Sequence, residues 1–179
     1  MIKKVLLVLA AVVAVILIAG AFQSSSYRVE RSVTIAAPAA DVFAQVNDLH
    51  KSQVWSPWVK LDPAAKYTFE GPASGVGAVN AWDGNSDVGA GRQTIIESKP
   101  NELVRVKLEF FKPMAGEATA EFIFKPEGQG TTVTWSMYGP KNYVSKVMCM
   151  FVSMDKMIGS HFADGLASLK TLAESPGKK

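Results

Sequence analysis

The strict alternation of apolar and polar residues in the second half of the chain limits the fold more than any other feature. Between residues 104 and 110, apolar side chains occupy every second position and charged side chains stand between them. The same period of two returns at residues 118–124 and 133–137, after short turns. A period of two is typical of a strand with one buried face. Consecutive strands joined by short turns predict an antiparallel meander.

Four further strands are expected upstream, at residues 27–35, 67–69, 76–82 and 92–98. Two short helices separate the first of them from the rest. Pro38 suits the first turn of one helix. Asp48 can cap the second helix, which Pro57 is expected to end.

The last third of the chain predicts one long helix, from residue 142 to residue 174. Its apolar stripe recurs at spacings of three and four, and the Pro176-Gly177 pair is expected to end it. A helix is about 10 Å wide, so it covers only part of a seven-stranded sheet. The pattern therefore predicts an α+β domain with a cavity between the sheet and the helix.

An uncharged apolar run from Val5 to Phe22 precedes the domain. As a helix it is about 27 Å long, close to the thickness of a bilayer core. Lys3 and Lys4 stand before it, and the positive-inside rule keeps them in the cytoplasm. We expect an anchor of the cytoplasmic (inner) membrane with the domain on the extracytoplasmic side, which is the periplasm in a Gram-negative bacterium. Secretion after signal cleavage near Ala19-Gly20-Ala21 is the alternative.

The expected organisation is an anchor or signal segment (1–22), a linker (23–26), a globular domain (27–174) and a tail (175–179). The domain carries nearly balanced charge, so no nucleic-acid partner is predicted. Cys149 is the only cysteine and forms no intrachain disulfide. No ligand spacing for a metal appears, and neither a metal nor another cofactor is expected. The oligomeric state stays open.

Several runs of residues resemble the START-related (SRPBCC) superfamily, and most closely its polyketide cyclase/dehydrase-like branch. They are Val33–Phe43, Trp55–Trp58, Gly75–Ala78 and Gly159–Lys170, in this order. The resemblance implies the helix-grip fold: a seven-stranded antiparallel sheet wrapped around a long C-terminal helix. It also implies binding of apolar molecules, because the superfamily includes lipid carriers, hormone receptors and aromatic cyclases.

The candidate ligand-binding residues are large apolar side chains predicted to face the cavity, together with one carboxylate. They are Trp55, Trp58, Trp82, Phe110, Phe122, Trp135, Met154, Asp155 and Ile158. Asp155 lies on the apolar stripe of the expected long helix. A carboxylate facing an apolar cavity has a raised pKa and can act as an acid or a base. Asp155 is therefore the single candidate catalytic residue. The alternatives are pairing with a cation such as Arg92 or Arg105, or simple exposure at the edge of the stripe.

Three functions fit these patterns. The first is a membrane-tethered binding or carrier protein for a hydrophobic small molecule or lipid. The second is an enzyme of the cyclase or dehydratase type on an aromatic or polyketide-like substrate, which needs a titratable group in the cavity. The third is a non-binding interaction module with a filled interior and an exposed apolar patch.

Overall fold

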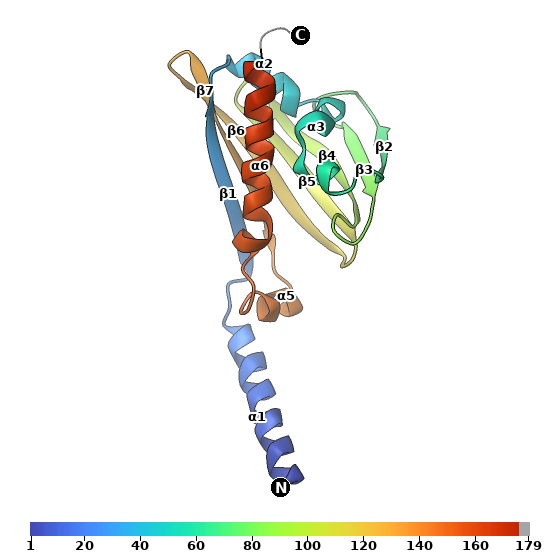
Figure 1. Cartoon of the computed structure of the whole chain (residues 1–179), viewed down its shortest axis with the longest axis vertical. Helices are drawn as coiled ribbons and strands as arrows, with labels where there is room; N and C mark the ends of the chain where they lie inside the picture. Colours follow the sequence, from blue (N-terminus) through green and yellow to red (C-terminus); the bar gives the residue numbers. More distant parts are fainter. Residues whose placement is uncertain (176–179) are drawn as a thin grey trace.

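The computed structural model describes residues 1–175 and contains one antiparallel sheet with helices on one of its faces (Figure 1). Pro176 and Gly177, expected to end the last helix, lie outside the described residues. The elements in chain order are α1 (Ile2–Ala21), β1 (Ser26–Ile35), α2 (Ala39–Val46), α3 (Leu49–Trp55), α4 (Pro57–Leu61), β2 (Lys66–Glu70), β3 (Val79–Asp83), β4 (Ala90–Lys99), β5 (Leu103–Lys112), β6 (Gly116–Glu127), β7 (Gly130–Pro140), α5 (Tyr143–Met148) and α6 (Met154–Glu174).

The strand order across the sheet is β1-β7-β6-β5-β4-β3-β2, and every pair is antiparallel. Strands β2 to β7 form the predicted meander, and β1 returns to lie beside β7. The seven-stranded sheet and the α+β class are therefore confirmed.

Two boundaries differ from the prediction because of local backbone geometry. The strand expected from residue 76 begins only at Val79, since Gly75 and Gly77 have φ angles of 77° and 90° and form a turn. A glycine reaches such angles without a steric penalty. Pro57 follows the end of α3 as predicted, but it also opens α4, where its missing N–H leaves no helical hydrogen bond unmade.

The predicted long C-terminal helix is two helices. The chain leaves the helical conformation after α5, and Ser153 starts α6 by accepting a hydrogen bond from the Lys156 N–H through its side chain. Three residues of the predicted apolar stripe are exposed here: Val144 and Met148 lie in α5 before the break, and Phe151 lies within it. The part of the expected apolar stripe that packs against the core therefore begins at Ile158. It continues along α6 through the buried residues Phe162, Leu166 and Leu169.

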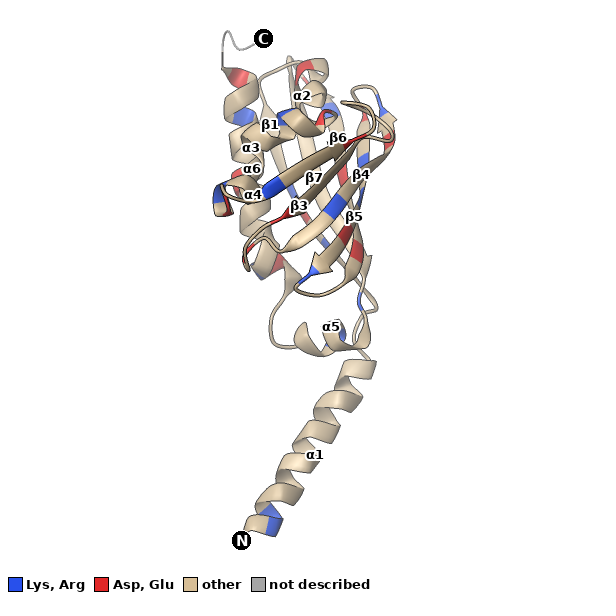
Figure 2. Ribbon diagram, turned by 90° about the vertical axis from the view of Figure 1, so that its right-hand side faces the viewer, with Lys and Arg blue, Asp and Glu red and all other residues tan. Residues whose placement is uncertain are grey.

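The two faces of the sheet have opposite chemistry. The inner face packs against α2, α3, α4 and α6 and contains the core. The outer face carries ion pairs between neighbouring strands, such as Arg105–Glu121 at 2.7 Å and Arg92–Glu109 at 2.9 Å. Figure 2 marks the basic and acidic residues along the strands. An antiparallel sheet with one solvated face shows this division. The cavity therefore has to lie on the helical side.

Helix α1 leaves from one end of the sheet and extends away from it (Figure 1). It is long and apolar enough to span a bilayer. Ser26 at the start of β1 pairs with Pro140 at the end of β7, and the backbone N–H of Lys141 donates to the Ser25 carbonyl at 2.8 Å. Because all strands are antiparallel, the β5–β6 hairpin and the β3–β4 loop lie at this same end.

Candidate ligand-binding cavity

A cavity of about 310 Å³ lies between the inner face of the sheet and helices α3, α4 and α6. Most of its wall is apolar. Seven of the nine predicted residues line it: Trp55, Trp58, Trp82, Phe110, Phe122, Trp135 and Ile158. The structure therefore brings together side chains from three helices and four strands of the inner face.

Stacked aromatic rings form the inner end of the cavity. Trp135 lies 4.1 Å from the parallel ring of Phe162 and 5.0 Å from the ring of Phe122, between centroids. Trp55 meets Trp135 edge-on at 5.8 Å and donates its indole N–H to the Gln45 carbonyl at 3.1 Å. All four rings are buried. Their packing leaves this wall rigid and apolar.

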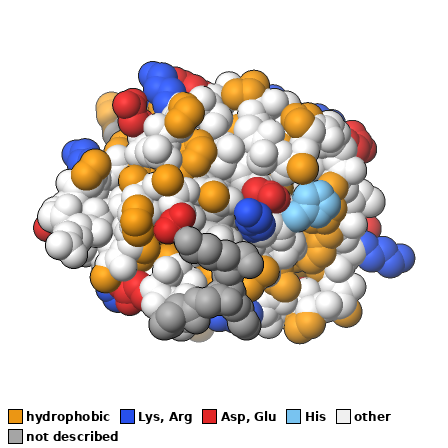
Figure 3. All heavy atoms as spheres, turned by 90° about the horizontal axis from the view of Figure 1, so that it is seen from above, with side chains coloured by type: hydrophobic (Ala, Val, Ile, Leu, Met, Phe, Trp, Pro, Cys, Tyr) orange, Lys and Arg blue, Asp and Glu red, His pale blue; other side chains and the backbone are white. Residues whose placement is uncertain are grey.

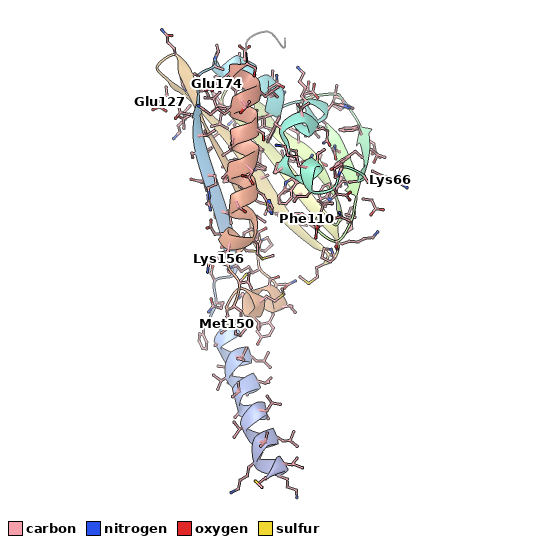
Figure 4. The ribbon with its side chains drawn as sticks, in the orientation of Figure 1. Lys66, Phe110, Glu127, Met150, Lys156 and Glu174 are labelled. Atoms are coloured by element: carbon pink, nitrogen blue, oxygen red, sulfur yellow. The ribbon has the colours of Figure 1, made fainter. Side chains whose placement is uncertain are left out.

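A second aromatic pair stands nearer to the end of the sheet from which α1 leaves. The ring of Trp82 contacts Phe110 edge-on at 6.1 Å, and its indole N–H donates to the Val88 carbonyl at 3.1 Å. This hydrogen bond fixes the β3–β4 loop against the cavity. Figure 4 labels Phe110, which comes from β5.

The mouth of the cavity is at this end. Among the lining residues only Ser86, Asp87, Lys112 and Pro113 are exposed. The first two belong to the β3–β4 loop and the other two to the β5–β6 hairpin. Both elements lie at the α1 end of the sheet, so the cavity reaches the surface on the side that faces α1.

The interior of the cavity offers few groups that transfer protons. Asp87 is the one carboxylate and Lys112 the one ammonium among the lining residues of the described chain, and both stand at the mouth. Tyr67 is the lining phenol, and burial together with the nearby Asp62 raises its pKa. Its hydroxyl is therefore neutral at physiological pH. In residues 1–175 no group of three His, Cys, Asp or Glu side chains is placed to hold a metal ion.

Asp155 lies outside the cavity, contrary to the prediction. Its side chain is 57% exposed and forms an ion pair with Arg31 of β1 at 2.8 Å, rather than with Arg92 or Arg105. The hydrogen bond from Arg31 lowers the pKa of Asp155, where an apolar cavity would raise it. Asp155 stands in the first turn of α6, and Met154 beside it packs against the core without lining the cavity.

The prediction missed lining residues of two kinds. Leu108 and Met137 share a strand face with predicted residues two positions away, and Phe162 lies one helical turn from Ile158. The period of two or four was therefore a sufficient signal for them. Residues 86–89 have no such periodicity. Their place at the mouth follows only from the folded β3–β4 loop.

The family described as polyketide cyclase / dehydrase and lipid transport matches residues 26–174. The chain belongs to this family. The match begins at the first residue of β1 and ends at the last residue of α6, so it covers the sheet, the helices over it and the cavity. It leaves out α1. No curated protein sequence matches the chain.

Solved structures show the same fold at low sequence identity. The di-domain ARO/CYC StfQ from the steffimycin biosynthetic pathway is 12% identical with a TM-score of 0.63, covering 83% of this chain and 51% of StfQ. Major latex-like protein 151 from Panax ginseng is 16% identical with a TM-score of 0.58, covering 85% and 100%. Protein CV1439 from Chromobacterium violaceum is 15% identical with a TM-score of 0.56, covering 84% and 98%.

Proposed function

We propose that the protein binds a hydrophobic small molecule or lipid in the cavity and carries or presents it at the outer face of the membrane that holds α1. The observation that carries this proposal is an apolar cavity whose mouth lies at the α1 end of the sheet. The family description, which includes lipid transport, supports it.

The size and lining of the cavity suit such a ligand. Its volume of about 310 Å³ is at the lower end of the range of small-molecule sites. It fits a compact ring system or part of an acyl chain. Each square ångström of apolar ligand surface removed from water contributes about 25 cal/mol. An apolar molecule therefore binds here through burial, without a charged partner inside.

The N-terminal sequence supports the proposed location of the domain at the outer face of the membrane. Lys3 and Lys4 precede α1, and no charge follows them before Arg28. The positive-inside rule then places the lysines in the cytoplasm and the cavity domain on the opposite side. A tethered domain samples only the membrane surface beside it. Apolar cargo that leaves the bilayer therefore has a short path to the mouth.

Binding fits the cavity better than cyclisation or dehydration does. The carboxylate at the mouth is exposed, and Asp155, the candidate acid or base, pairs with Arg31 outside the cavity. A general acid or base has to lie within hydrogen-bond reach of the reacting atom. The interior described above offers Tyr67 and serine hydroxyls for orientation instead.

Native mass spectrometry of the full chain released from lipid nanodiscs tests the proposal. We expect a bound apolar molecule that survives release from the lipid. Ala120→Phe fills the floor of the cavity, where Ala120 is buried and lines the wall. The new ring takes the place of about 60 Å² of contact with the ligand, which removes roughly 1.5 kcal/mol of binding free energy. The affinity for the ligand should therefore fall about tenfold.

The matched control is Ile96→Phe, which adds the same ring at an exposed position on β4 outside the cavity wall. It should leave the bound fraction unchanged. Loss of the bound molecule in Ala120→Phe alone therefore distinguishes a ligand in the cavity from lipid held around α1. A chain that is released empty, or an adduct that survives Ala120→Phe unchanged, would overturn the proposal.

A further inference from the structure

We propose that the segment Lys141–Val152, which contains α5, lies in the headgroup region of the bilayer and holds the mouth of the cavity against the lipid surface. This inference rests on the proposed function to the extent that α1 is an uncleaved membrane anchor. It adds a second membrane contact, made by the globular domain itself.

The position of α5 follows from its contacts with α1. The Tyr143 hydroxyl donates to the Leu17 carbonyl, and Val147 packs so closely on Gly20 that a side chain there would clash. Helix α1 has 20 residues, which at 1.5 Å each give about 30 Å, the thickness of a bilayer core. Leu17 lies four residues, about 6 Å, before the end of α1. Helix α5 is therefore level with the boundary between acyl chains and headgroups.

The surface of this segment is apolar and basic. Apart from Asn142, the exposed side chains are large and hydrophobic, with Phe151 70% exposed and Met148 52% exposed. Lys141 and Lys146 are its charged residues, and no Asp or Glu occurs between Glu127 and Asp155. In Figure 2 the ribbons of α1 and α5 carry the blue of basic residues and none of the red of acidic residues. Apolar contact area with lysines beside it is the composition of an interfacial helix, and it favours anionic lipid.

The opposite end of the molecule has different chemistry. Seen from that end, hydrophobic side chains are scattered among acidic, basic and uncharged polar ones (Figure 3), whereas five of the twelve residues of Lys141–Val152 are exposed large hydrophobics: Tyr143, Val144, Met148, Phe151 and Val152. A general tendency of this fold to expose apolar residues would not concentrate them at the α1 end. The exposed apolar side chains of Lys141–Val152 therefore mark a specific surface.

The β5–β6 hairpin extends the same surface to the mouth. Phe111 and Met114 are about half exposed, and they stand on either side of the mouth residues Lys112 and Pro113. The hairpin lies at the α1 end of the sheet by its strand register. With both the hairpin and α5 in contact with lipid, apolar cargo enters the cavity without crossing open water.

The bilayer is the occupant that the contacts favour. Helix α5 packs on the membrane-spanning helix near its end, so any surface that continues from α1 through α5 first meets lipid. Met150, labelled in Figure 4, lies in the loop that follows α5, between α1 and the sheet. A second copy of the chain or a partner protein would have to displace lipid from this position.

Spin labelling of the full chain in vesicles of phosphatidylcholine and phosphatidylglycerol tests the inference. Cys149 is the only cysteine, so Cys149→Ser provides a background for single labels at Val144→Cys, Phe151→Cys and Met114→Cys. All three positions are exposed, which leaves the packing intact. Gln129→Cys in the distant β6–β7 turn is the matched aqueous control. The measurement compares collision with oxygen, which enriches in lipid, and with a water-soluble nickel chelate.

We expect the three labels to collide with oxygen several-fold more, relative to the nickel chelate, than the label at residue 129. Nickel accessibility equal to that of the control would overturn the inference. Protection from both reagents, with or without dipolar broadening between copies, would also overturn it, because it would mean that protein covers the surface.

This experiment fails separately from the proposed function. If the labels lie in water but the chain still carries an apolar ligand, the membrane contact of Lys141–Val152 is rejected and the carrier function stands. If the labels lie in lipid but the chain never carries a ligand, the membrane contact stands and the carrier function is rejected.

Discussion

At the scale of single residues, the neighbours of a carboxylate decide what it can do. Asp155 was placed by pattern on an apolar stripe, where burial would raise its pKa. In the folded chain it meets Arg31, and the hydrogen bond and the positive charge lower the pKa instead. The lowered pKa means that Asp155 stays ionised at every pH near neutrality. It contributes to holding α6 against β1 rather than to proton transfer.

Asp155→Asn should therefore leave ligand binding unchanged, within about twofold. It should lower the unfolding midpoint slightly at neutral pH, whereas below the folded pKa, where Asp155 is protonated, the variant and the natural chain should be equally stable. A carboxylate with a lowered folded pKa stabilises the fold above its unfolded pKa, about 3.9, and loses this contribution as the pH falls through the folded value. The variant should therefore lack part of the decline in unfolding midpoint between pH 5 and pH 3. Urea unfolding of the detergent-solubilised full chain measures it. If Asp155→Asn lost its bound ligand at neutral pH, the conclusion that Asp155 acts outside the cavity would be wrong.

The identity of most cavity residues could be predicted because the wall uses the regular periods of strands and helices. Phe110, Phe122 and Trp135 follow from alternation alone. The partner of Asp155 could not be predicted in this way, since Arg31 stands 124 positions away in the chain. Sequence patterns fix which face a residue occupies, and the neighbour across that face depends on how elements meet.

At the scale of elements, two glycines set how closely α6 approaches the sheet. A Cβ on Gly165 would lie 2.8 Å from Cζ3 of Trp135 and 2.9 Å from Cδ of Pro57. A Cβ on Gly159 would meet the guanidinium of Arg31, the flexible end of a long side chain. The first neighbours are parts of the packed core and the second can move. The two positions therefore respond differently to the same substitution.

Gly165→Ala should destabilise the protein by about 1–3 kcal/mol, because overpacking against rigid rings outweighs the gain in helix propensity. Gly159→Ala should cost less, since Arg31 can swing away, and it should mimic the loss of the Arg31–Asp155 pair. Gly165→Ala should also weaken ligand binding, because Trp135 lines the cavity. Equal unfolding midpoints for the two variants would show that α6 shifts freely on the sheet.

The break between α5 and α6 could not be predicted from the chain alone. Residues 149–153 contain neither Pro nor Gly, and the apolar spacing continues through them. The interruption makes sense only in three dimensions, because α5 packs on α1 while α6 packs on β1 and the core. A single continuous helix would turn one apolar stripe toward one partner, whereas α5 packs on α1 and α6 buries its side chains against the sheet and the core. The strand count, by contrast, required only local alternation and turns.

At the scale of the whole molecule, one end of the sheet collects the anchor, α5 and the mouth. The antiparallel register makes this arrangement necessary, because β1 starts, β5 ends and β4 starts at the same edge. The seven strands and their order as a meander were predictable. The position of the cavity mouth could not be predicted. It depends on β1 lying beside β7 and on the loop of residues 84–89, which has no regular pattern.

If cargo passes between the β3–β4 loop and the β5–β6 hairpin, a bridge across the mouth should slow its exchange without weakening its binding. Asp87→Cys with Lys112→Cys, in the Cys149→Ser background, places one thiol on each side, at exposed lining residues. A bismaleimide should then slow ligand release into acceptor vesicles by about tenfold or more, a rise of about 1.4 kcal/mol in the barrier. The matched control bridges Lys125→Cys and Gln129→Cys in the distant β6–β7 hairpin and should leave the rate unchanged. Because a bridge at the mouth touches neither the aromatic wall nor α6, a slower rate at equal affinity identifies the route of entry, and an unaltered rate would mean that the ligand leaves elsewhere.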